Sequence, residues 1–326
     1  MSQVPQPPVP QPPVAPSSAS APSARPPVSP LSRIRVGSAP DSWGVWFPED
    51  PLQVPWRRFL DEVARAGYEW IELGPYGYLP TDPRRLAEET ARRGLKVSAG
   101  TVFTGLHRGP AVWEDTWRQV ERVAGLARAT GAGHLVVIPA FWRDDKTGEV
   151  LEDRELTAAQ WHDLARQTER LAHEVRERYG LRVVVHPHAD THVAGEADVA
   201  RFLDATDPDL VSLCLDTGHY AYCGGDSVAL IQTYGDRVGY LHLKQVDPAV
   251  LAGVRAEDLP FGPAVARGVM CEPPTGIPAL EPVLTAAQGL GVDLFAIVEQ
   301  DMYPCPPERP LPVAARTRSF LRSCGA

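Results

Sequence analysis

The sequence lacks a long hydrophobic run, an excess of positive charge and an ordered set of cysteines, and each absence excludes a class of protein. No apolar stretch approaches the about 20 residues of a membrane-spanning helix, so no membrane partner is expected. A formal net charge of −9 argues against nucleic acid as a partner. The five cysteines fit neither a disulfide framework nor a zinc motif, so we expect a cytoplasmic protein with reduced thiols.

The start of the chain differs in composition from everything that follows it. About a third of residues 1–30 are proline, mixed mainly with serine, alanine and glutamine. This segment has too little apolar surface for a core, and it lacks the apolar centre of a signal peptide. We therefore expect a disordered proline-rich tail over residues 1–32 and a single catalytic domain over residues 33–326.

From residue 33 onward, short apolar runs alternate with amphipathic stretches at helical spacing. The expected strands cover 33–40, 68–74, 95–103, 134–140, the region of 183–190, 210–216, 237–244 and 292–301. The expected helices cover 55–67, 82–94, 111–130, 157–179, 195–205, 226–235, 278–289 and 309–323. Eight such units predict an α/β fold of the (β/α)8 TIM barrel type. An open doubly wound sheet is the alternative, but no glycine-rich phosphate loop follows the first strand.

Metal-binding or titratable residues stand where several of these strands end, which is where barrel enzymes carry their catalytic groups. They are Glu72, His186 with His188, Asp216 with His219, His242 with Lys244, and Glu299.

Four consecutive strands should bring His186, Asp216, His242 and Glu299 to one rim. Steps of 30 and 26 residues separate the first three, about one strand–helix unit each. Two imidazoles with two carboxylates suit Mn, Co, Zn or Fe better than Mg. The sequence therefore predicts a divalent metal site. Either His186 or His188 can be the ligand, since both share one strand face, and the register favours His186.

Aromatic residues follow the first two strands. Trp43 and Trp46 lie in "APDSWGVWF" and can form either the floor for a sugar ring or a plug in the barrel mouth. Tyr76 and Tyr78 lie in "GPYGYLPTDP" and supply hydroxyl groups. We therefore assign these four side chains to substrate binding.

The motifs "CLDTGHY", "YLHLKQVD" and "FAIVEQD" resemble the xylose isomerase-like TIM barrel superfamily of sugar phosphate isomerases and epimerases. The resemblance covers residues 34–322, and "ELGPYGYLPTDP" and "HPHADTHV" are most similar to the inosose dehydratases. It implies that Asp216, His242 and Glu299 are metal ligands and that His219 contacts the substrate.

One position departs from the epimerases of this superfamily, whose fifth strand usually carries a glutamate ligand where this chain has His186. Proton removal and return by two carboxylates is therefore disfavoured. Loss of water needs one base, one acid and a metal. We expect a metal-dependent lyase that dehydrates a polyhydroxy ketone, such as an inosose, through an enediolate. Candidate bases are Lys244, Glu72 and His188, and candidate acids are His188 and His219.

Three other functions remain open. An isomerase or epimerase of a ketose would use the same metal ring. An apurinic-site endonuclease would need further histidines on the early strands, where His107 stands alone. A protein that only binds a polyol would keep the fold without turnover. The segment 247–275 is expected to be a lid or a contact in a homo-oligomer.

Overall fold

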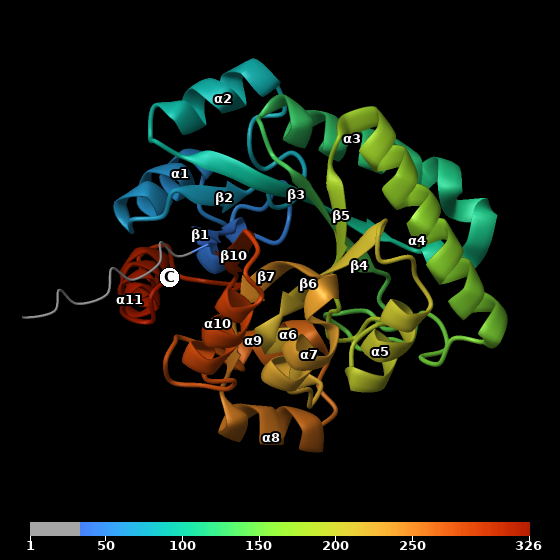
Figure 1. Ribbon diagram of the computed structural model, residues 1–326. Coiled ribbons are helices and arrows are strands. Elements are labelled where there is room, and N and C mark those ends of the chain that lie inside the picture. The colour runs from blue at the N-terminus through green and yellow to red at the C-terminus, as the bar shows by residue number, and fades with distance from the viewer. Residues whose placement is uncertain (1–32) are drawn as a thin grey trace, which may run out of the picture. The chain divides into compact units, whose positions relative to one another are not determined.

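Eight parallel strands close into a barrel in the computed structural model, which describes residues 33–326 (Figure 1). Around the barrel the order is β1, β10, β7, β6, β5, β4, β3 and β2. The strands are β1 (Ile34–Ser38), β2 (Trp70–Glu72), β3 (Lys96–Thr104), β4 (His134–Pro139), β5 (Arg182–Val185), β6 (Val211–Asp216), β7 (Val238–Leu243) and β10 (Leu294–Val298). The predicted TIM barrel is confirmed, whereas the predicted tail over residues 1–32 lies outside the described residues.

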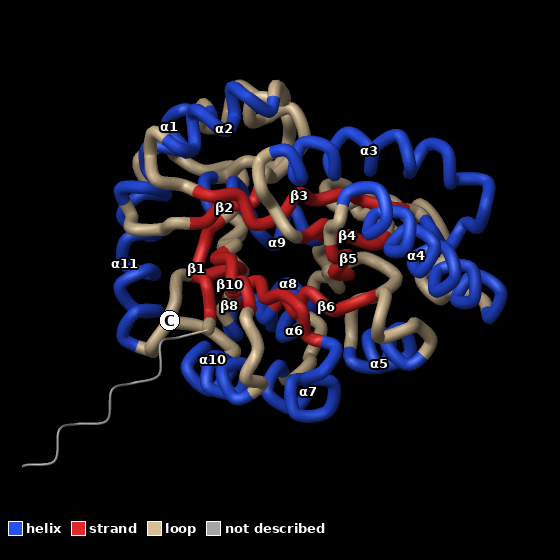
Figure 2. The backbone as a smooth tube through the Cα atoms, turned by 45° about the horizontal axis from the view of Figure 1, so that its top comes forward, coloured by secondary structure: helices blue, strands red, loops and turns tan. Residues whose placement is uncertain are grey.

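Helices form the outer ring around the strands, as Figure 2 shows. They are α1 (Trp56–Arg65), α2 (Pro83–Ala91), α3 (Trp113–Ala129), α4 (Ala158–Tyr179), α5 (Glu196–Asp204), α7 (Ser227–Tyr234), α10 (Leu280–Gly289) and α11 (Pro310–Ser323). Local signals set their ends: Asp82 caps α2, and Thr157 with Gln160 forms a capping box on α4. Across residues 33–326, no helix is both long and apolar enough to cross a membrane.

Short elements occupy the connections. Three 3-10 helices are η1 (Pro40–Trp43), η2 (Leu106–Val112) and η3 (Gly235–Arg237), and α6 (Thr217–Tyr222) follows β6 directly. The fifth strand ends at Val185, earlier than the sequence indicated, because Pro187 has no amide proton to continue the ladder.

Side chains fill the interior of the barrel on the amino-terminal side of the polar residues that stand at the carboxyl ends of the strands. The buried cluster there comprises Ala39, Ala99, Val136, Ile138, Val184, Cys214, Tyr240, Phe295 and Ile297. The Tyr240 hydroxyl donates to Ser98 Oγ at 2.8 Å, so even the polar atoms at this level are satisfied within the protein. This packed layer separates the polar residues at the carboxyl ends of the strands from the opposite end of the barrel.

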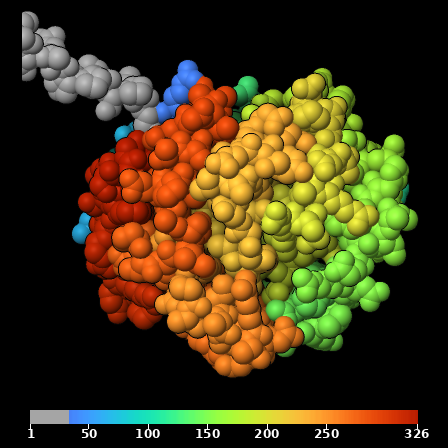
Figure 3. All heavy atoms as spheres, turned by 60° about the horizontal axis from the view of Figure 1, so that its bottom comes forward, coloured from blue at the N-terminus to red at the C-terminus, as the bar shows by residue number. Residues whose placement is uncertain are grey.

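The segment between β7 and α10 forms a separate covering layer with its own small apolar core. It contains β8 (Gln245–Val246), α8 (Pro248–Ala256), α9 (Phe261–Ala266) and β9 (Met270–Cys271), with β8 and β9 paired antiparallel. The Gly262 amide donates to the Asp145 carbonyl at 2.7 Å. Figure 3 shows the orange atoms of this segment beside the green atoms that follow β4.

Candidate metal centre

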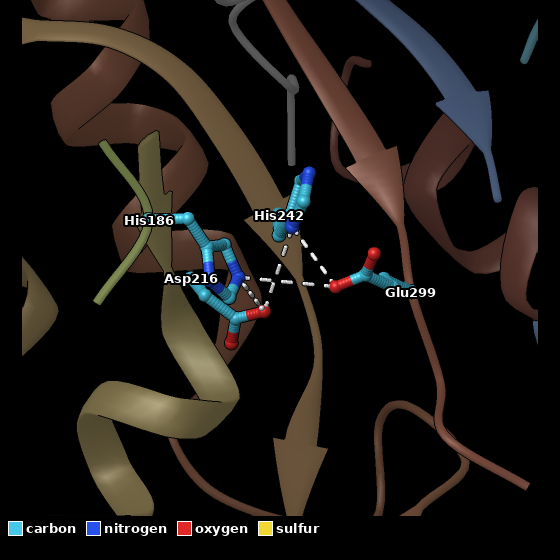
Figure 4. Close-up of side chains that lie close together, drawn as sticks. All are labelled: His186, Asp216, His242 and Glu299. Atoms are coloured by element: carbon cyan, nitrogen blue, oxygen red, sulfur yellow. Dashed lines mark hydrogen bonds and ion pairs between the residues drawn. The ribbon is translucent and has the colours of Figure 1, made fainter. Parts of the chain in front are cut away.

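Four potential ligands converge at the carboxyl ends of the strands: His186, Asp216, His242 and Glu299 (Figure 4). His242 Nδ1 lies 2.9 Å from Glu299 Oε2 and 3.8 Å from Asp216 Oδ2. His186 Nε2 lies 3.3 Å from Asp216 Oδ2 and 3.9 Å from Glu299 Oε2. Ligand atoms about 2.1 Å from one ion stand about 3.0–3.4 Å apart when adjacent. Two of the observed separations, 2.9 and 3.3 Å, are close to this range, and the other two, 3.8 and 3.9 Å, exceed it by at most 0.5 Å. A small movement of the side chains would therefore suit one cation.

Strand register places these side chains. Asp216 and His242 are direct partners across the β6–β7 pair. Glu299 follows β10, and its amide donates to the Leu243 carbonyl at 3.2 Å. His186 follows β5, and its amide donates to the Val137 carbonyl at 2.9 Å. Each ligand thus sits at a ladder position rather than on a free loop, which keeps the ring rigid.

A buried carboxylate fixes the orientation of the His242 ring. Glu72 Oε1 lies 2.7 Å from His242 Nε2, and the Thr101 hydroxyl donates to Glu72 Oε2 at 3.2 Å. A carboxylate accepts, so the ring proton belongs on Nε2 and the Nδ1 lone pair faces the ring of ligands. His242 Nδ1 is also a buried atom with no hydrogen-bond partner among the described residues. Such an atom fits a metal ligand.

Lys244 supplies a positive charge beside the two carboxylate ligands. Its fully buried ammonium lies 3.2 Å from Asp216 Oδ2, 3.1 Å from Glu299 Oε2 and 2.7 Å from Asp301 Oδ2. Burial lowers the pKa of Lys244, but these carboxylates outweigh it and hold that pKa well above its ordinary value. Burial likewise opposes ionisation of Asp216, yet Lys244 and His186 lower its pKa to about 2. Both charges therefore persist at neutral pH.

A cavity of about 750 Å³ reaches this group of side chains at Glu299. Its lining includes Asp41, Trp46, Tyr76, Phe103, Phe141, His188, Phe261, Glu299 and Asp301. The Trp46 indole donates to Asp301 Oδ1 at 3.2 Å and stacks on Phe261 with ring centroids 6.1 Å apart. The predicted contributions of Trp46 and Tyr76 to a cavity wall therefore match their positions.

Two aromatic residues assigned to substrate lie elsewhere. Trp43 is buried, donates to Glu62 Oε2 at 2.9 Å and packs edge-on against Phe59. Tyr78 donates to the Val54 carbonyl at 3.0 Å and is absent from the lining of the cavity. The sequence placed them near the mouth because both follow a strand, but their rings turn outward into the helical shell.

The remaining predicted residues divide by what they contact. His188 lines the cavity, and its Nδ1 lies 2.7 Å from the Ala189 carbonyl. His219 packs against the His188 ring at 3.7 Å and its Nε2 lies 3.1 Å from Lys244 Nζ. Glu72, His219 and Lys244 are not among the residues that line the cavity.

Asp41, Asp301 and Phe261 are among the cavity residues that escaped the sequence reasoning. Asp301 stands two residues after Glu299, so strand alternation was an available signal. Asp41 follows the first strand within a motif chosen for its tryptophans. Burial, with Glu299 and Asp301 nearby, raises the pKa of Asp41 well above its ordinary value. Phe261 belongs to the covering segment, and its position depends on tertiary packing alone.

Comparison with known proteins places this geometry in a family. The sequence profile of the xylose isomerase-like TIM barrel family matches residues 60–324. An inosose dehydratase of Lacticaseibacillus casei is 30% identical over 294 residues, which cover 88% of this chain and 96% of the relative.

Two solved structures share the fold at 16% identity. The IOLI protein with a bound zinc atom aligns at a TM-score of 0.62, covering 89% of this chain and 98% of its own. An L-ribulose 3-epimerase aligns at a TM-score of 0.63, covering 89% of this chain and 94% of its own.

Fold and site together define a barrel enzyme whose working face is the carboxyl end of its strands. The chain belongs to the xylose isomerase-like TIM barrel family. The resemblance seen in its motifs, including that to the inosose dehydratases, is confirmed.

Proposed function

We propose that the protein is a metal-dependent lyase that removes water from a polyhydroxy ketone such as an inosose. The observation that carries the proposal is the convergence of His186, Asp216, His242 and Glu299 beside a cavity that Glu299 helps to line. The lining of this cavity offers an imidazole from His188 and carboxyl groups from Asp41 and Asp301. The inosose dehydratase relative supports the substrate class of a sugar or cyclitol.

The ring of ligands would hold a divalent cation such as Mn, Co, Zn or Fe. When bound, the ion would polarise the substrate carbonyl and acidify the neighbouring C–H. Glu72 serves this site by holding the His242 ring, at 2.7 Å, rather than by touching substrate. The zinc atom in the IOLI protein supports a metal of this kind.

His188 is the base of the proposed reaction. Its Nδ1 donates to the Ala189 carbonyl at 2.7 Å, so a neutral ring carries no proton on Nε2. The ring lines the cavity beside His186, with centroids 5.7 Å apart. His188 Nε2 therefore can remove the proton from the carbon next to the carbonyl. His219 packs behind it and positions it.

Asp41 is the acid that protonates the departing hydroxyl. It lines the same cavity as His188. Glu299, Asp301 and burial favour its protonated form. The aromatic walls formed by Trp46 and Tyr76 suit the apolar C–H face of a cyclitol.

Turnover of inososes in H₂O and D₂O tests the proposal. We expect loss of water, seen as an enone-type absorbance, to depend on added Mn²⁺, Co²⁺ or Zn²⁺. His188→Asn keeps the donor to Ala189 and removes Nε2, so it should retain metal and lose turnover. Solvent deuterium incorporation without any dehydration would instead establish an isomerase or epimerase and overturn the lyase.

A further inference from the structure

A second group of metal-binding side chains lies outside the site described above, where three loops meet. His107 belongs to η2 after β3, Glu152 to the segment after β4, and His192 to the segment after β5. His107 Nε2 lies 3.0 Å from Glu152 Oε2, and His192 Nε2 lies 3.1 Å from Glu152 Oε1. The His side chains are 1% and 0% exposed and that of Glu152 is 21% exposed. We call these three residues the loop cluster.

The hydrogen bonds of His192 indicate that its contact with Glu152 needs an additional positive charge. His192 Nδ1 lies 3.0 Å from the Arg154 carbonyl, so this nitrogen must carry the proton. The contact between His192 Nε2 and Glu152 Oε1, 3.1 Å long, then needs either a second proton on the ring or a cation between the two atoms. Two acceptors facing each other in a buried place are unfavourable. A cation between them removes the conflict, and a ligating histidine typically donates its other nitrogen in this way.

The loop cluster also repeats the histidine geometry of the barrel site. The His107 and His192 rings have centroids 4.5 Å apart and an interplanar angle of 57°. The corresponding values for His186 and His242 are 4.8 Å and 52°. His107 and His192 contact different oxygens of Glu152, at 3.0 and 3.1 Å, and one ligand atom from each of the three residues lies within 4.8 Å of the others. An ion with bonds of about 2.0–2.2 Å fits among ligand atoms at such separations.

We propose that His107, Glu152 and His192 form a second, structural site for a divalent transition metal of the zinc class. Two imidazoles and one carboxylate supply three ligands, and water on the partly exposed side of Glu152 supplies the fourth. Arg108 contacts Glu152 Oε1 at 2.8 Å and Oε2 at 3.4 Å. The carboxylate of Glu152 would therefore be shared between the ion and Arg108.

The position of the loop cluster indicates what the ion would do. Arg108 and Leu151 both line the cavity, and each is adjacent in sequence to a residue of the cluster. An ion there would tie the loops after β3, β4 and β5 together and fix one wall of the cavity. The role proposed is positional, since no residue of the cluster is among those that line the cavity.

Zinc titration of the full chain tests the second site. Protein stripped with a chelator is titrated with Zn²⁺ against a chromophoric competitor. The wild type should bind two ions per chain. His107→Gln with His192→Gln should bind one, Asp216→Asn with Glu299→Gln should bind one, and the combination none. Exchange of the exposed α4 residues His162 and His173 for glutamine is the matched control and should still bind two.

Two further readouts separate the second site from the proposed function. In the Asp216→Asn, Glu299→Gln background, Co²⁺ should give the visible absorption of a four-coordinate ion, and Zn²⁺ should raise the unfolding temperature. The second site is refuted if the wild type binds one ion and the variant with both His107→Gln and His192→Gln still binds it. The three residues of the loop cluster would then only form hydrogen bonds with one another. Such a result would leave the lyase proposal untouched, whereas failure of the barrel site alone would leave the loop ion in place.

Discussion

The barrel site and the loop cluster join histidines and carboxylates in nearly the same ring geometry, yet they are built differently. The four potential ligands of the barrel site stand at or just after the ends of hydrogen-bonded strands, with Lys244 beside them. The three potential ligands of the loop cluster lie on three different loops, with Arg108 as their cationic neighbour. Strand register can be inferred from sequence spacing, but the meeting of three loops cannot. The barrel site should therefore be rigid, whereas the geometry of the loop cluster should depend on the contacts among its three residues.

The largest expected effect follows from removing ligands of the barrel site. Exchange of Asp216 for Asn or Glu299 for Gln removes the negative charge that holds the ion. Affinity for the barrel ion should fall by at least about 100-fold, and dehydration should fall with it. Metal analysis and turnover on the same preparations measure both. Full activity with normal metal content in Glu299→Gln would mean that the ring is not the working site.

A smaller loss is expected when the partner of His242 is altered. Glu72→Gln weakens the acceptor for His242 Nε2–H and loosens the ring. Metal affinity at the barrel site should fall about 10–100-fold while the loop cluster is unaffected. Competition titration with a chelator resolves the two sites. An equal loss at both would show that the variant disturbs the fold rather than one ligand.

The loop cluster is expected to be sensitive to acid when metal is removed. Burial opposes ionisation of Glu152, but hydrogen bonds from Arg108, His107 and His192 lower its pKa from 4.5 to about 2. This depressed pKa adds stability above pH 4.5 that is lost as the pH falls toward 2. Glu152→Gln should cost about 2 kcal/mol at pH 7, allowing for partial exposure, and less at pH 3. Urea unfolding in the presence of a chelator measures the difference in the free energy of unfolding between the wild type and Glu152→Gln. A difference that is larger at pH 3 than at pH 7 would contradict the prediction.

The smallest effects should come from aromatic residues outside both sites. Tyr78→Phe removes a hydrogen bond to the Val54 carbonyl and should cost about 1 kcal/mol of stability, with turnover within about twofold of wild type. Tyr76→Phe alters a cavity wall and should raise KM instead. Steady-state kinetics beside thermal unfolding separates the two tyrosines. A raised KM in Tyr78→Phe would contradict its placement.

Sequence predicted the barrel well because each strand–helix unit repeats the same signal. The convergence of His186, Asp216, His242 and Glu299 was inferable because a strand end is a defined place in this fold. Trp43 shows the limit of that reasoning: it follows β1 as Trp46 does, but a 3-10 turn directs its indole toward Glu62.

Other residues could not be placed from sequence for a physical reason. His192 lies in the quoted motif "HPHADTHV", yet nothing local brings it to Glu152, 40 residues away. Phe261 reaches the cavity because Asp190 Oδ2 accepts from its amide at 2.8 Å, and Asp190 also pairs with Arg143 at 2.8 Å. Such long-range contacts depend on the assembled fold.

The covering segment begins only three residues after His242, so the strand that carries a ligand leads directly into the roof of the cavity. The roof contributes Phe261 but no ligand, and it folds around a small core of its own. Related chains can therefore exchange this roof for another and acquire a new substrate while the floor, and the chemistry performed there, stays the same.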